Sequence, residues 1–324
     1  MYEERLRVAL KKTFGIKDFK AEPLAGGFSN AKLYKILVNN KDYVLRLSNN
    51  ELKDMENEIK CMTLASRIGV SPKVYYANAQ EGVMIMDYIK NKKLIAGELS
   101  DPKVVIQLAT LLHRLHNEKP LFPKYRYKTV INFLLEMEKS LGCPNKSNLV
   151  YEGIKKLKAI NKKLVKIKLK KSSHNDLNPN NILYDGKRFW IIDWEAAGCS
   201  DPVFDLATVS NFMIYNKKLE ALYLKTYFKE IPTKIDRDHY LVMKQVSRCY
   251  YGVLLTFMAK NFGSQPLTVE EIQELDLENI QNKLNDKKMS LANPHDMEVF
   301  AAALIKAGLN AMNGEEFQKS LSNL

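Results

Sequence analysis

Residues 174–183 read HNDLNPNNIL and residues 191–195 read IIDWE, and these two runs are the most informative in the chain. Asp176 and Asn181 stand five positions apart, and Asp193 follows twelve positions later at the end of an apolar run. An Asp-Gly pair at residues 185–186 is a strong turn signal, so the chain between Asn181 and Asp193 is predicted to fold as a β-hairpin. That hairpin returns its two ends to one place. We therefore expect Asp176, Asn181 and Asp193 to form a single site.

These three side chains fit the needs of phosphoryl transfer from ATP. That reaction is catalysed mainly by positioning and by electrostatic stabilisation, so it requires few chemical groups. Asp176 fits the carboxylate that orients an acceptor hydroxyl, and Asn181 and Asp193 offer the oxygen ligands that Mg²⁺ prefers. His174 is expected to fix the loop rather than to transfer a proton. A loop rich in asparagine and proline, without any chemistry, is the alternative interpretation.

The order of these residues resembles the catalytic and metal loops of the choline/ethanolamine kinase and aminoglycoside phosphotransferase superfamily, which is related to the protein kinases. The resemblance implies ATP and Mg²⁺ as cofactors. It also implies that Asp176 is the catalytic base or orienting carboxylate, and that Asn181 and Asp193 hold magnesium. The run DPVFDLA at residues 201–207 resembles the continuation of the same family, where Asp205 is expected to hold the catalytic loop through backbone bonds.

The first ninety residues predict a small sheet interrupted by one helix. Runs rich in β-forming residues alternate with Gly and Asn turns, and a helical apolar pattern covers residues 51–68 before Gly69 and Pro72. The predicted strands are Phe19–Leu24, Ala31–Val38, Tyr43–Leu47, Lys73–Ala77 and Val83–Tyr88.

The rest of the chain predicts mainly helices, with one further β-rich patch at Ile182–Tyr184 and Phe189–Ile192. The predicted helices include Val104–His116, Val130–Leu141, Tyr151–Lys171, Leu219–Phe228, Tyr240–Met258 and Met297–Ala311. Together with the resemblance, this indicates an α+β, two-lobed protein-kinase-like fold. Residues 1–88 are expected to form a nucleotide-binding lobe, and residues 89–324 a helical lobe with the catalytic loop and an acceptor pocket.

A glycine-rich turn lies between the first two predicted strands. The run LAGGFSN at residues 24–30 places backbone N–H groups at a hairpin turn, where they can cradle phosphate oxygens. It resembles the phosphate loop of choline kinases, which assigns Gly26, Gly27, Ser29 and Asn30 to ATP binding. An ordinary tight turn is the alternative interpretation.

Two charged residues in the predicted N-terminal lobe extend the resemblance. Arg46 occupies the strand position at which protein kinases carry a lysine, and an arginine suits bidentate contact with phosphate. Glu58, on the next helix, is the expected partner that holds Arg46 in place. The segment MDYI at residues 86–89 is the expected hinge, where the backbone of Asp87 and Ile89 meets adenine. Solvated surface charges are the alternative for Arg46 and Glu58.

The acceptor is expected to be a small molecule rather than a polypeptide. After the metal aspartate the sequence reads DWE, where protein kinases carry DFG. About a dozen residues separate Asp193 from Asp205, which is too short for a long activation loop.

Choline and ethanolamine are the acceptors that the resemblance suggests first. Choline kinases hold a quaternary ammonium group with aromatic rings and carboxylates. They usually carry tryptophans where this chain has tyrosines, and tyrosines at helical spacing are also typical of core packing. Thiamine kinase, an aminoglycoside-type phosphotransferase and a catalytically dead kinase-like binding module therefore remain alternatives. The candidate acceptor-binding residues are Asn178, Glu195, Tyr215, Tyr250 and Tyr251.

The composition is that of an ordinary globular protein, with 46% hydrophobic and 27% charged residues in a chain of 324. A net charge of +13 favours anionic partners, or simply solubility. Lysines concentrate in the predicted helix at residues 155–171, where a solvated face is the first interpretation and weak contact with acidic lipid surfaces is the alternative. That stretch has no aromatic residue for base stacking, which disfavours nucleic-acid binding.

Several classes of protein are disfavoured by simple counts. No apolar run is long enough to span a bilayer, and the N-terminus lacks the apolar centre of a secretion signal. The four cysteines form no CxxC pair, so reduced thiols are expected and a zinc site is not. These features predict a cytoplasmic protein.

Overall fold

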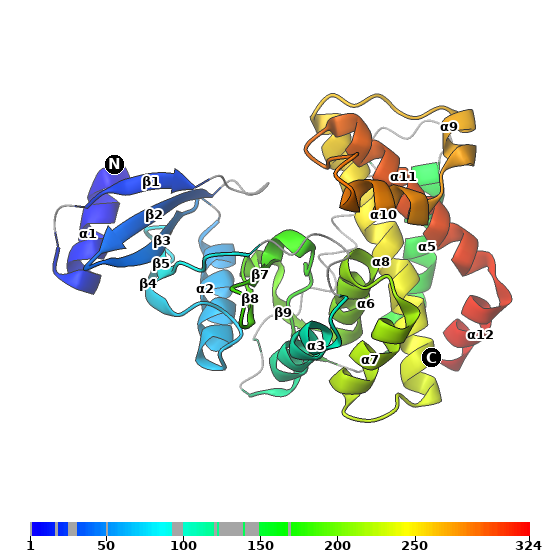
Figure 1. Ribbon diagram of the computed structural model, residues 1–324, viewed down its shortest axis with the longest axis horizontal. Coiled ribbons are helices and arrows are strands. Elements are labelled where there is room, and N and C mark those ends of the chain that lie inside the picture. The colour runs from blue at the N-terminus through cyan, green and yellow to red at the C-terminus, as the bar shows by residue number, and fades with distance from the viewer. Residues whose placement is uncertain are drawn as a thin grey trace. The chain divides into compact units, whose positions relative to one another are not determined.

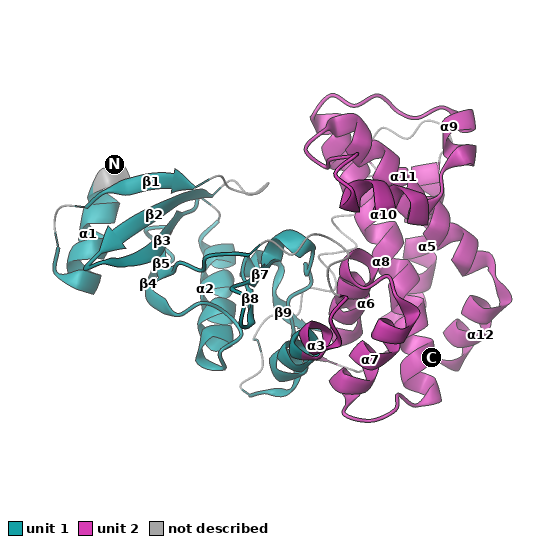
Figure 2. Cartoon of the chain, viewed as in Figure 1, with its two compact units in different colours: residues 1–94, 107–125, 171–200 teal, residues 95–106, 126–170, 201–324 magenta. Residues whose placement is uncertain are grey.

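The computed structural model describes residues 2–16, 19–24, 31–49, 51–92, 100–119, 122, 139, 149–167 and 170–324. The chain forms two compact units (Figure 2). The first unit comprises residues 1–94, 107–125 and 171–200, and the second comprises residues 95–106, 126–170 and 201–324. The segment with the predicted catalytic loop thus belongs with the N-terminal sheet. The lobe boundary after residue 88 stays a prediction, and only Lys139 of the predicted helix Val130–Leu141 lies among the described residues.

The first unit contains an antiparallel sheet whose strand order is β1-β2-β3-β5-β4 (Figure 1). The strands are β1 (Ala21–Leu24), β2 (Lys32–Val38), β3 (Lys41–Leu47), β4 (Val74–Asn78) and β5 (Val83–Asp87). Asn39 and Asn40 join β2 to β3 with positive φ angles of 49° and 60°, as a two-residue hairpin turn requires. The five predicted strands are therefore confirmed, within a few residues at their ends.

Helix α1 (Tyr2–Phe14) covers one face of this sheet. Its buried side chains Leu6, Ala9 and Leu10 pack against Ile36 and Leu45, which project from neighbouring strands. This helix was not predicted, because its few apolar residues are interspersed with charges and give a weak local pattern. It is stabilised by the sheet that it buries rather than by its own sequence.

Helix α2 (Leu52–Arg67) follows β3 and buries a face that includes Met55, Glu58 and Cys61. It ends at Arg67, close to Gly69 as predicted, and the φ of 70° at Gly69 is the left-handed conformation that follows many helices. The N–H of Val70 then donates to the carbonyl of Ala65 at 2.9 Å, which completes the helix end.

The predicted catalytic segment is built from two short antiparallel pairs. Strand β6 (Lys171–Ser173) pairs with β9 (Gly198–Ser200), and β7 (Ile182–Tyr184) pairs with β8 (Phe189–Ile191). The Asp185 carboxylate accepts the N–H groups of Lys187 and Arg188, both at 2.8 Å, and so closes the hairpin turn that the sequence predicts. Short 3₁₀ turns, η1 (Pro179–Asn181) and η2 (Trp194–Ala196), precede β7 and follow β8. Helix α3 (Pro102–Asn117) contributes to this region through Arg114, which reaches the carbonyl of Ile68.

The described residues of the second unit form helices joined by loops and turns, without any strand. Its helices are α5 (Leu149–Leu164), α6 (Pro202–Met213), α7 (Lys217–Phe228), α8 (Lys234–Asn261), α9 (Val269–Glu274), α10 (Leu277–Asn285), α11 (Pro294–Asn313) and α12 (Glu315–Asn323). Capping side chains start several of them, and Thr233 and Asp236 form a complete capping box before α8. The predicted helix Tyr151–Lys171 was too long at its C-terminal end, since α5 stops at Leu164.

Helices α8 and α11 cross at small residues. A Cβ atom on Gly252 would lie 2.4 Å from Cγ1 of Ile305 and 2.8 Å from the Ala301 carbonyl oxygen. A Cβ atom on Gly308 would lie 2.6 Å from the sulfur of Cys249. The two backbones therefore approach more closely than any side chain would allow. None of the described helices is long and apolar enough to cross a membrane.

Candidate active site

Asp176, Asn181 and Asp193 all belong to the first unit, where hydrogen bonds link the first two directly. The side-chain amide of Asn181 donates to the carboxylate of Asp176 at 3.0 Å and to its backbone carbonyl at 2.9 Å. The amide of Asn178 donates to the other carboxylate oxygen of Asp176 at 3.1 Å. Two amides thus fix the orientation of this carboxylate. Because the nitrogen of Asn181 is committed to Asp176, its oxygen is the atom that can face a cation.

Asp193 lies just beyond β8 in an unusual conformation. Its φ of 64° is left-handed, which is uncommon for a residue other than glycine. One oxygen of its carboxylate, Oδ1, is buried without a hydrogen-bond partner. Burial raises the pKa of this carboxyl against the opposing charge of Arg46 and His174, and the nearby charge of Asp176 adds to the rise. A buried oxygen of this kind is costly unless a cation or donor compensates it.

The donor set of Asn181 and Asp193 fits magnesium. Both supply hard oxygen atoms, and Asp193 has one such atom buried and unpartnered. Among the described residues there is no cluster of three His, Cys, Asp or Glu side chains that could hold a metal. Mg²⁺ usually takes only one or two protein carboxylates and keeps water and phosphates as its other ligands.

Arg46 and Glu58 form the ion pair that the sequence predicts. Nη1 of Arg46 lies 2.9 Å from both carboxylate oxygens of Glu58, and the two residues are only 6% and 1% exposed. Burial raises the pKa of Glu58 to about 7, although the charge of Arg46 opposes the rise. Nη2 of Arg46 is buried without a partner. Glu58 therefore holds the guanidinium of Arg46 in place, and Nη2 remains available to donate a hydrogen bond.

His174 fixes the catalytic loop, as expected. Its Nε2 lies 2.9 Å from the carbonyl of Ile192, to which it donates, and its Nδ1 accepts the N–H of Asp176 at 3.3 Å. Its ring packs edge-on against Trp194 with a centroid distance of 4.8 Å. The ring is fully buried. Its bonds to Ile192 and Asp176 connect the predicted catalytic loop to the chain around Asp193.

The expected nucleotide-binding residues are only partly described. Gly26, Gly27, Ser29 and Asn30 lie outside the described residues. Asp87 ends β5, and its N–H already donates to the carbonyl of Lys73 at 2.9 Å. Its carbonyl oxygen is therefore the group that it can offer to a base.

The side chain of Asp87 makes surface contacts instead. It pairs with Lys41 at 2.7 Å and accepts the Tyr75 hydroxyl at 3.0 Å. Ile89, two residues further along, is half-buried.

The candidate acceptor residues divide between the two units. Asn178 and exposed Glu195 belong to the first unit, beside Asp176 and Asp193 in the sequence. The three tyrosines belong to the second unit.

The tyrosines gather around the aromatic residues of α6. Tyr251 is 3% exposed and its ring lies 5.0 Å from that of Phe212, whereas Tyr250 is half-buried at 5.6 Å from Phe204. The hydroxyl of Tyr215 donates to the carbonyl of Phe212 at 2.7 Å. Tyr251 thus has the burial of a core residue, while Tyr250 and Tyr215 keep accessible surface.

Sequence reasoning missed two asparagines that support the site. Asn175 donates to the carbonyl of Ala196 at 2.9 Å, and Asn57 on α2 donates to the carbonyl of Ala197 at 3.0 Å. Asn175 directly precedes Asp176, where an asparagine could have suggested a left-handed backbone. For Asn57 the sequence offers no signal beyond its position next to Glu58.

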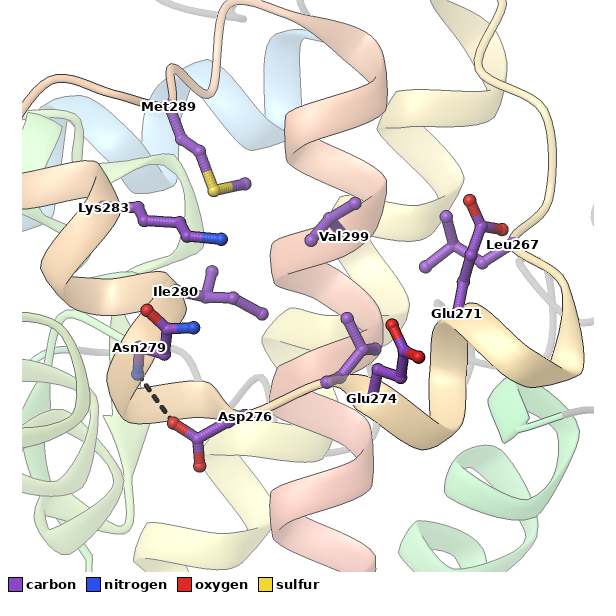
Figure 3. A pocket seen from close by; sticks show the side chains of 10 residues that line it. Leu267, Glu271, Glu274, Asp276, Asn279, Ile280, Lys283, Met289 and Val299 are labelled. Atoms are coloured by element: carbon purple, nitrogen blue, oxygen red, sulfur yellow. Dashed lines mark hydrogen bonds between the residues drawn. The ribbon is translucent and has the colours of Figure 1, made fainter.

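A separate cavity of about 220 Å³ lies in the second unit beside α9, α10 and α11 (Figure 3). Its lining mixes apolar and acidic side chains, but Glu271 and Asp276 already accept backbone N–H groups at the starts of α9 and α10. None of the predicted site residues lines it. The lining residues are Leu267, Glu271, Glu274, Leu275, Asp276, Asn279, Ile280, Lys283, Met289 and Val299.

Comparison with known sequences points to one family. The sequence model of the Phosphotransferase enzyme family matches residues 20–234. Protein LicA of Haemophilus influenzae is 26% identical over 212 residues, which are 62% of this chain and 61% of LicA. The match therefore spans less than two thirds of that curated relative.

Comparison with solved structures gives the same fold. A choline/ethanolamine kinase family protein from Mesorhizobium loti superposes with a TM-score of 0.67 at 19% identity, over 99% of this chain and 98% of the other. The choline kinase LicA from Streptococcus pneumoniae superposes with a TM-score of 0.60 at 18% identity, over 88% of this chain and 99% of the other. At these identities the likeness concerns the fold. It confirms the predicted two-lobed α+β fold and the predicted resemblance.

Proposed function

This chain belongs to the phosphotransferase enzyme family, and on that premise we propose that it is an ATP- and Mg²⁺-dependent kinase of a small alcohol. Choline or ethanolamine is the acceptor that we propose first. The observation that carries the proposal is the arrangement of Asp176, Asn181 and Asp193 in one compact unit. Asn181 holds the carboxylate of Asp176, and Asp193 keeps a buried oxygen without a protein partner.

Asp176 takes the part of the orienting carboxylate. Held by Asn178 and Asn181, it accepts a hydrogen bond from the acceptor hydroxyl and takes its proton as the oxygen bonds to the γ-phosphorus. The bond from that phosphorus to its bridging oxygen breaks, and ADP leaves. Asn181 and Asp193 would hold magnesium, and the metal would supply positive charge to offset the negative charge of the phosphates.

Arg46 takes the part of a phosphate-binding cation. Glu58 holds its Nη1, and its Nη2 is a buried donor without a protein partner. A phosphate oxygen would accept a hydrogen bond from that donor and so remove the cost of burying it unpaired. Gly26, Gly27, Ser29 and Asn30 are proposed to cradle the phosphates, and the backbone of Asp87 and Ile89 to meet adenine.

The acceptor rests on less direct support. The solved LicA of Streptococcus pneumoniae is a choline kinase, and the short stretch after Asp193 favours a small acceptor. Tyr215 and Tyr250, which keep accessible surface, are proposed to face a cationic amino alcohol, and Tyr251 to pack against Phe212 behind them. Glu195 and Asn178 are proposed as polar groups that contact the acceptor. A cytoplasmic location stays a prediction.

The test is an ADP-release assay that offers choline, ethanolamine, thiamine and an aminoglycoside in turn, with and without Mg²⁺. We expect turnover with choline or ethanolamine that chelation of Mg²⁺ abolishes. Asp176→Asn should lower kcat by about 10³-fold or more without changing the melting temperature. Asp286→Asn, which alters an exposed aspartate, is the matched control and should keep full activity.

Two outcomes would contradict the proposal. Near-normal turnover by Asp176→Asn would remove Asp176 from the chemistry. Tight ATP binding without turnover of any acceptor would favour a binding module instead. Turnover of thiamine or an aminoglycoside alone would keep the kinase chemistry and replace the acceptor.

A further inference from the structure

The backbone conformation and the side-chain hydrogen bonds of Asn175 are not explained by the proposed role of Asp176, the next residue. Asn175 directly precedes Asp176 and has a φ of 67°, a left-handed conformation that Asn tolerates better than most residues. Its side chain is fully committed. The amide nitrogen donates to the carbonyl of Ala196 at 2.9 Å, and the amide oxygen accepts the hydroxyl of Ser200.

The partners of Asn175 lie on the chain that follows Asp193. Ala196 is three residues beyond Asp193, and Ser200 is in β9. His174 contacts the other side, where it donates to the carbonyl of Ile192. The side chains of residues 174 and 175 are therefore hydrogen-bonded to the chain just before and just after Asp193. These bonds connect the two residues before Asp176 to the chain on either side of Asp193.

Helix α2 is attached to the same short segment. Asn57, which is buried, donates to the carbonyl of Ala197 at 3.0 Å. Its neighbour in the sequence is Glu58, the partner of Arg46. Two asparagine amides thus bind adjacent carbonyl groups, those of Ala196 and Ala197. One connects the segment to the catalytic loop, and the other connects it to the helix that positions Arg46.

We propose that Asn175 is a positioning residue that, through its bonds to Ala196 and Ser200, sets where the metal-binding carboxylate Asp193 lies relative to Asp176. The proposal rests on the kinase chemistry proposed above. Asn175 is not expected to touch the nucleotide or the acceptor. It acts through the backbone of residues 196–200, in the way that outer residues commonly orient the ligands of a metal.

The decisive variants separate the side chain from the backbone. Asn175→Gly keeps the left-handed backbone accessible and removes both bonds, and Ser200→Ala removes only one of them. Asn40→Gly is the matched control, because Asn40 also has a left-handed backbone, at 60°, in the β2–β3 turn. Any general effect of a new glycine appears in both glycine variants.

The first measurement needs no activity. Hydrogen–deuterium exchange of the metal-free protein is followed in peptides that cover residues 192–200 and, for reference, β3. We expect Asn175→Gly to exchange at least about tenfold faster than wild type in residues 192–200 only, and Ser200→Ala to show a smaller increase. Asn40→Gly should leave residues 192–200 unchanged.

The second measurement is the magnesium dependence of turnover. We expect Asn175→Gly to lower kcat by about 10- to 100-fold and to raise the Mg²⁺ concentration for half-maximal rate by about tenfold, as losses of outer metal-site residues typically do. The KM for ATP at saturating Mg²⁺ should change by less than about threefold, a split that a general loss of stability would not produce.

The results distinguish this inference from the proposed function. Wild-type exchange in residues 192–200 of both Asn175→Gly and Ser200→Ala would overturn the inference, even if the enzyme is an active kinase. Faster exchange in residues 192–200, in a protein that turns over no acceptor, would support the positioning role of Asn175 and reject the proposed kinase function. If Asn175→Gly fails to fold, Ser200→Ala alone decides, by the same exchange and magnesium readouts.

Discussion

Asp193 combines two features that a residue selected for stability alone would avoid. Its backbone is left-handed, and one of its carboxylate oxygens is buried without a partner. Residues held in this way cluster at functional sites, because the surrounding structure enforces a conformation that is useful when a ligand arrives. Arg46 shows the same pattern with its buried, unpartnered Nη2. Together, an unsatisfied acceptor and an unsatisfied donor in one unit are what a bound metal and phosphate would use.

Glu298 is a buried acid outside this site, and it gives a pH-dependent prediction. It lies on α11, is 7% exposed, and has one carboxylate oxygen without a partner. Burial raises its pKa to about 7 from an ordinary value of 4.5. Between these two values the folded state holds a proton that the unfolded state has lost. The contribution of Glu298 to stability therefore falls as the pH rises from about 4.5 to about 7.

Glu298→Gln should remove this dependence. Urea unfolding at pH 5 and pH 8 should show little difference between the two proteins at pH 5, and at pH 8 the variant should be more stable by up to about 3 kcal/mol. Glu278→Gln, at an exposed position on α10, is the control and should follow wild type at both values. A variant less stable than wild type at pH 8 would mean that the carboxylate of Glu298 has a favourable partner.

At the scale of helices and strands, the features that were predicted best are turns and helix ends, which depend on a few neighbouring residues. The Asp185–Gly186 turn fixed the β7–β8 hairpin, and Gly69 fixed the end of α2. The predicted end of α5 was wrong because Ile167 continues the apolar spacing of that helix. The helix stops earlier, at Leu164, and Lys171 pairs with Ser200 of β9. Such a pairing depends on a strand distant in the sequence, so no local pattern contains it.

The crossing of α8 and α11 offers a prediction at this scale. In an exposed helix, Gly→Ala usually stabilises by about 1 kcal/mol, because alanine is the better helix former. At Gly252 the added Cβ atom would meet Ile305 and the Ala301 carbonyl at 2.4 and 2.8 Å. Gly252→Ala should therefore destabilise the protein by about 1–3 kcal/mol, as overpacked cores do.

Denaturant unfolding of Gly252→Ala and Gly314→Ala measures this difference. Gly314 follows α11, where an added Cβ atom would lie 3.3 Å from the Ala311 carbonyl oxygen. This contact is much milder than those at Gly252, so Gly314→Ala should cost clearly less stability than Gly252→Ala. Equal stabilities of Gly252→Ala and wild type would show that the two helices can separate at no cost, and the close approach would then not be needed for folding.

At the scale of the whole molecule, the candidate site residues were easier to predict than the residues that hold them in place. Asp176, Asn181 and Asp193 carry donor types and spacings that can be recognised in a single sequence, and Glu58 was expected beside Arg46. Asn57 and Asn175 were missed because they act through backbone carbonyls far along the chain, and a sequence does not display such partners. The roles of all these residues in binding and catalysis stay predictions.

The two units suggest a division of roles that kinetics can test. The residues proposed for metal and nucleotide belong to the first unit, and the aromatic candidates for the acceptor belong to the second. Tyr250 is the sharper of these candidates, because Tyr251 is buried against Phe212 whereas Tyr250 keeps accessible surface. Tyr250→Leu keeps apolar bulk on α8 and removes the ring that could attract a cationic acceptor.

We expect Tyr250→Leu to raise the KM for choline or ethanolamine by about 3- to 30-fold, the range of one cation–π contact, and to leave the KM for ATP within about twofold. Tyr76→Leu, which removes a half-buried tyrosine of β4, is the matched control and should change neither constant. The split matters because a ring that merely stabilises the fold would alter both constants, or neither, once the folded fraction is allowed for. An unchanged KM for the acceptor in Tyr250→Leu would mean that Tyr250 only packs in the core and does not contact the acceptor. Tyr215, which also keeps accessible surface, and the polar candidates Glu195 and Asn178 would then be the next residues to replace.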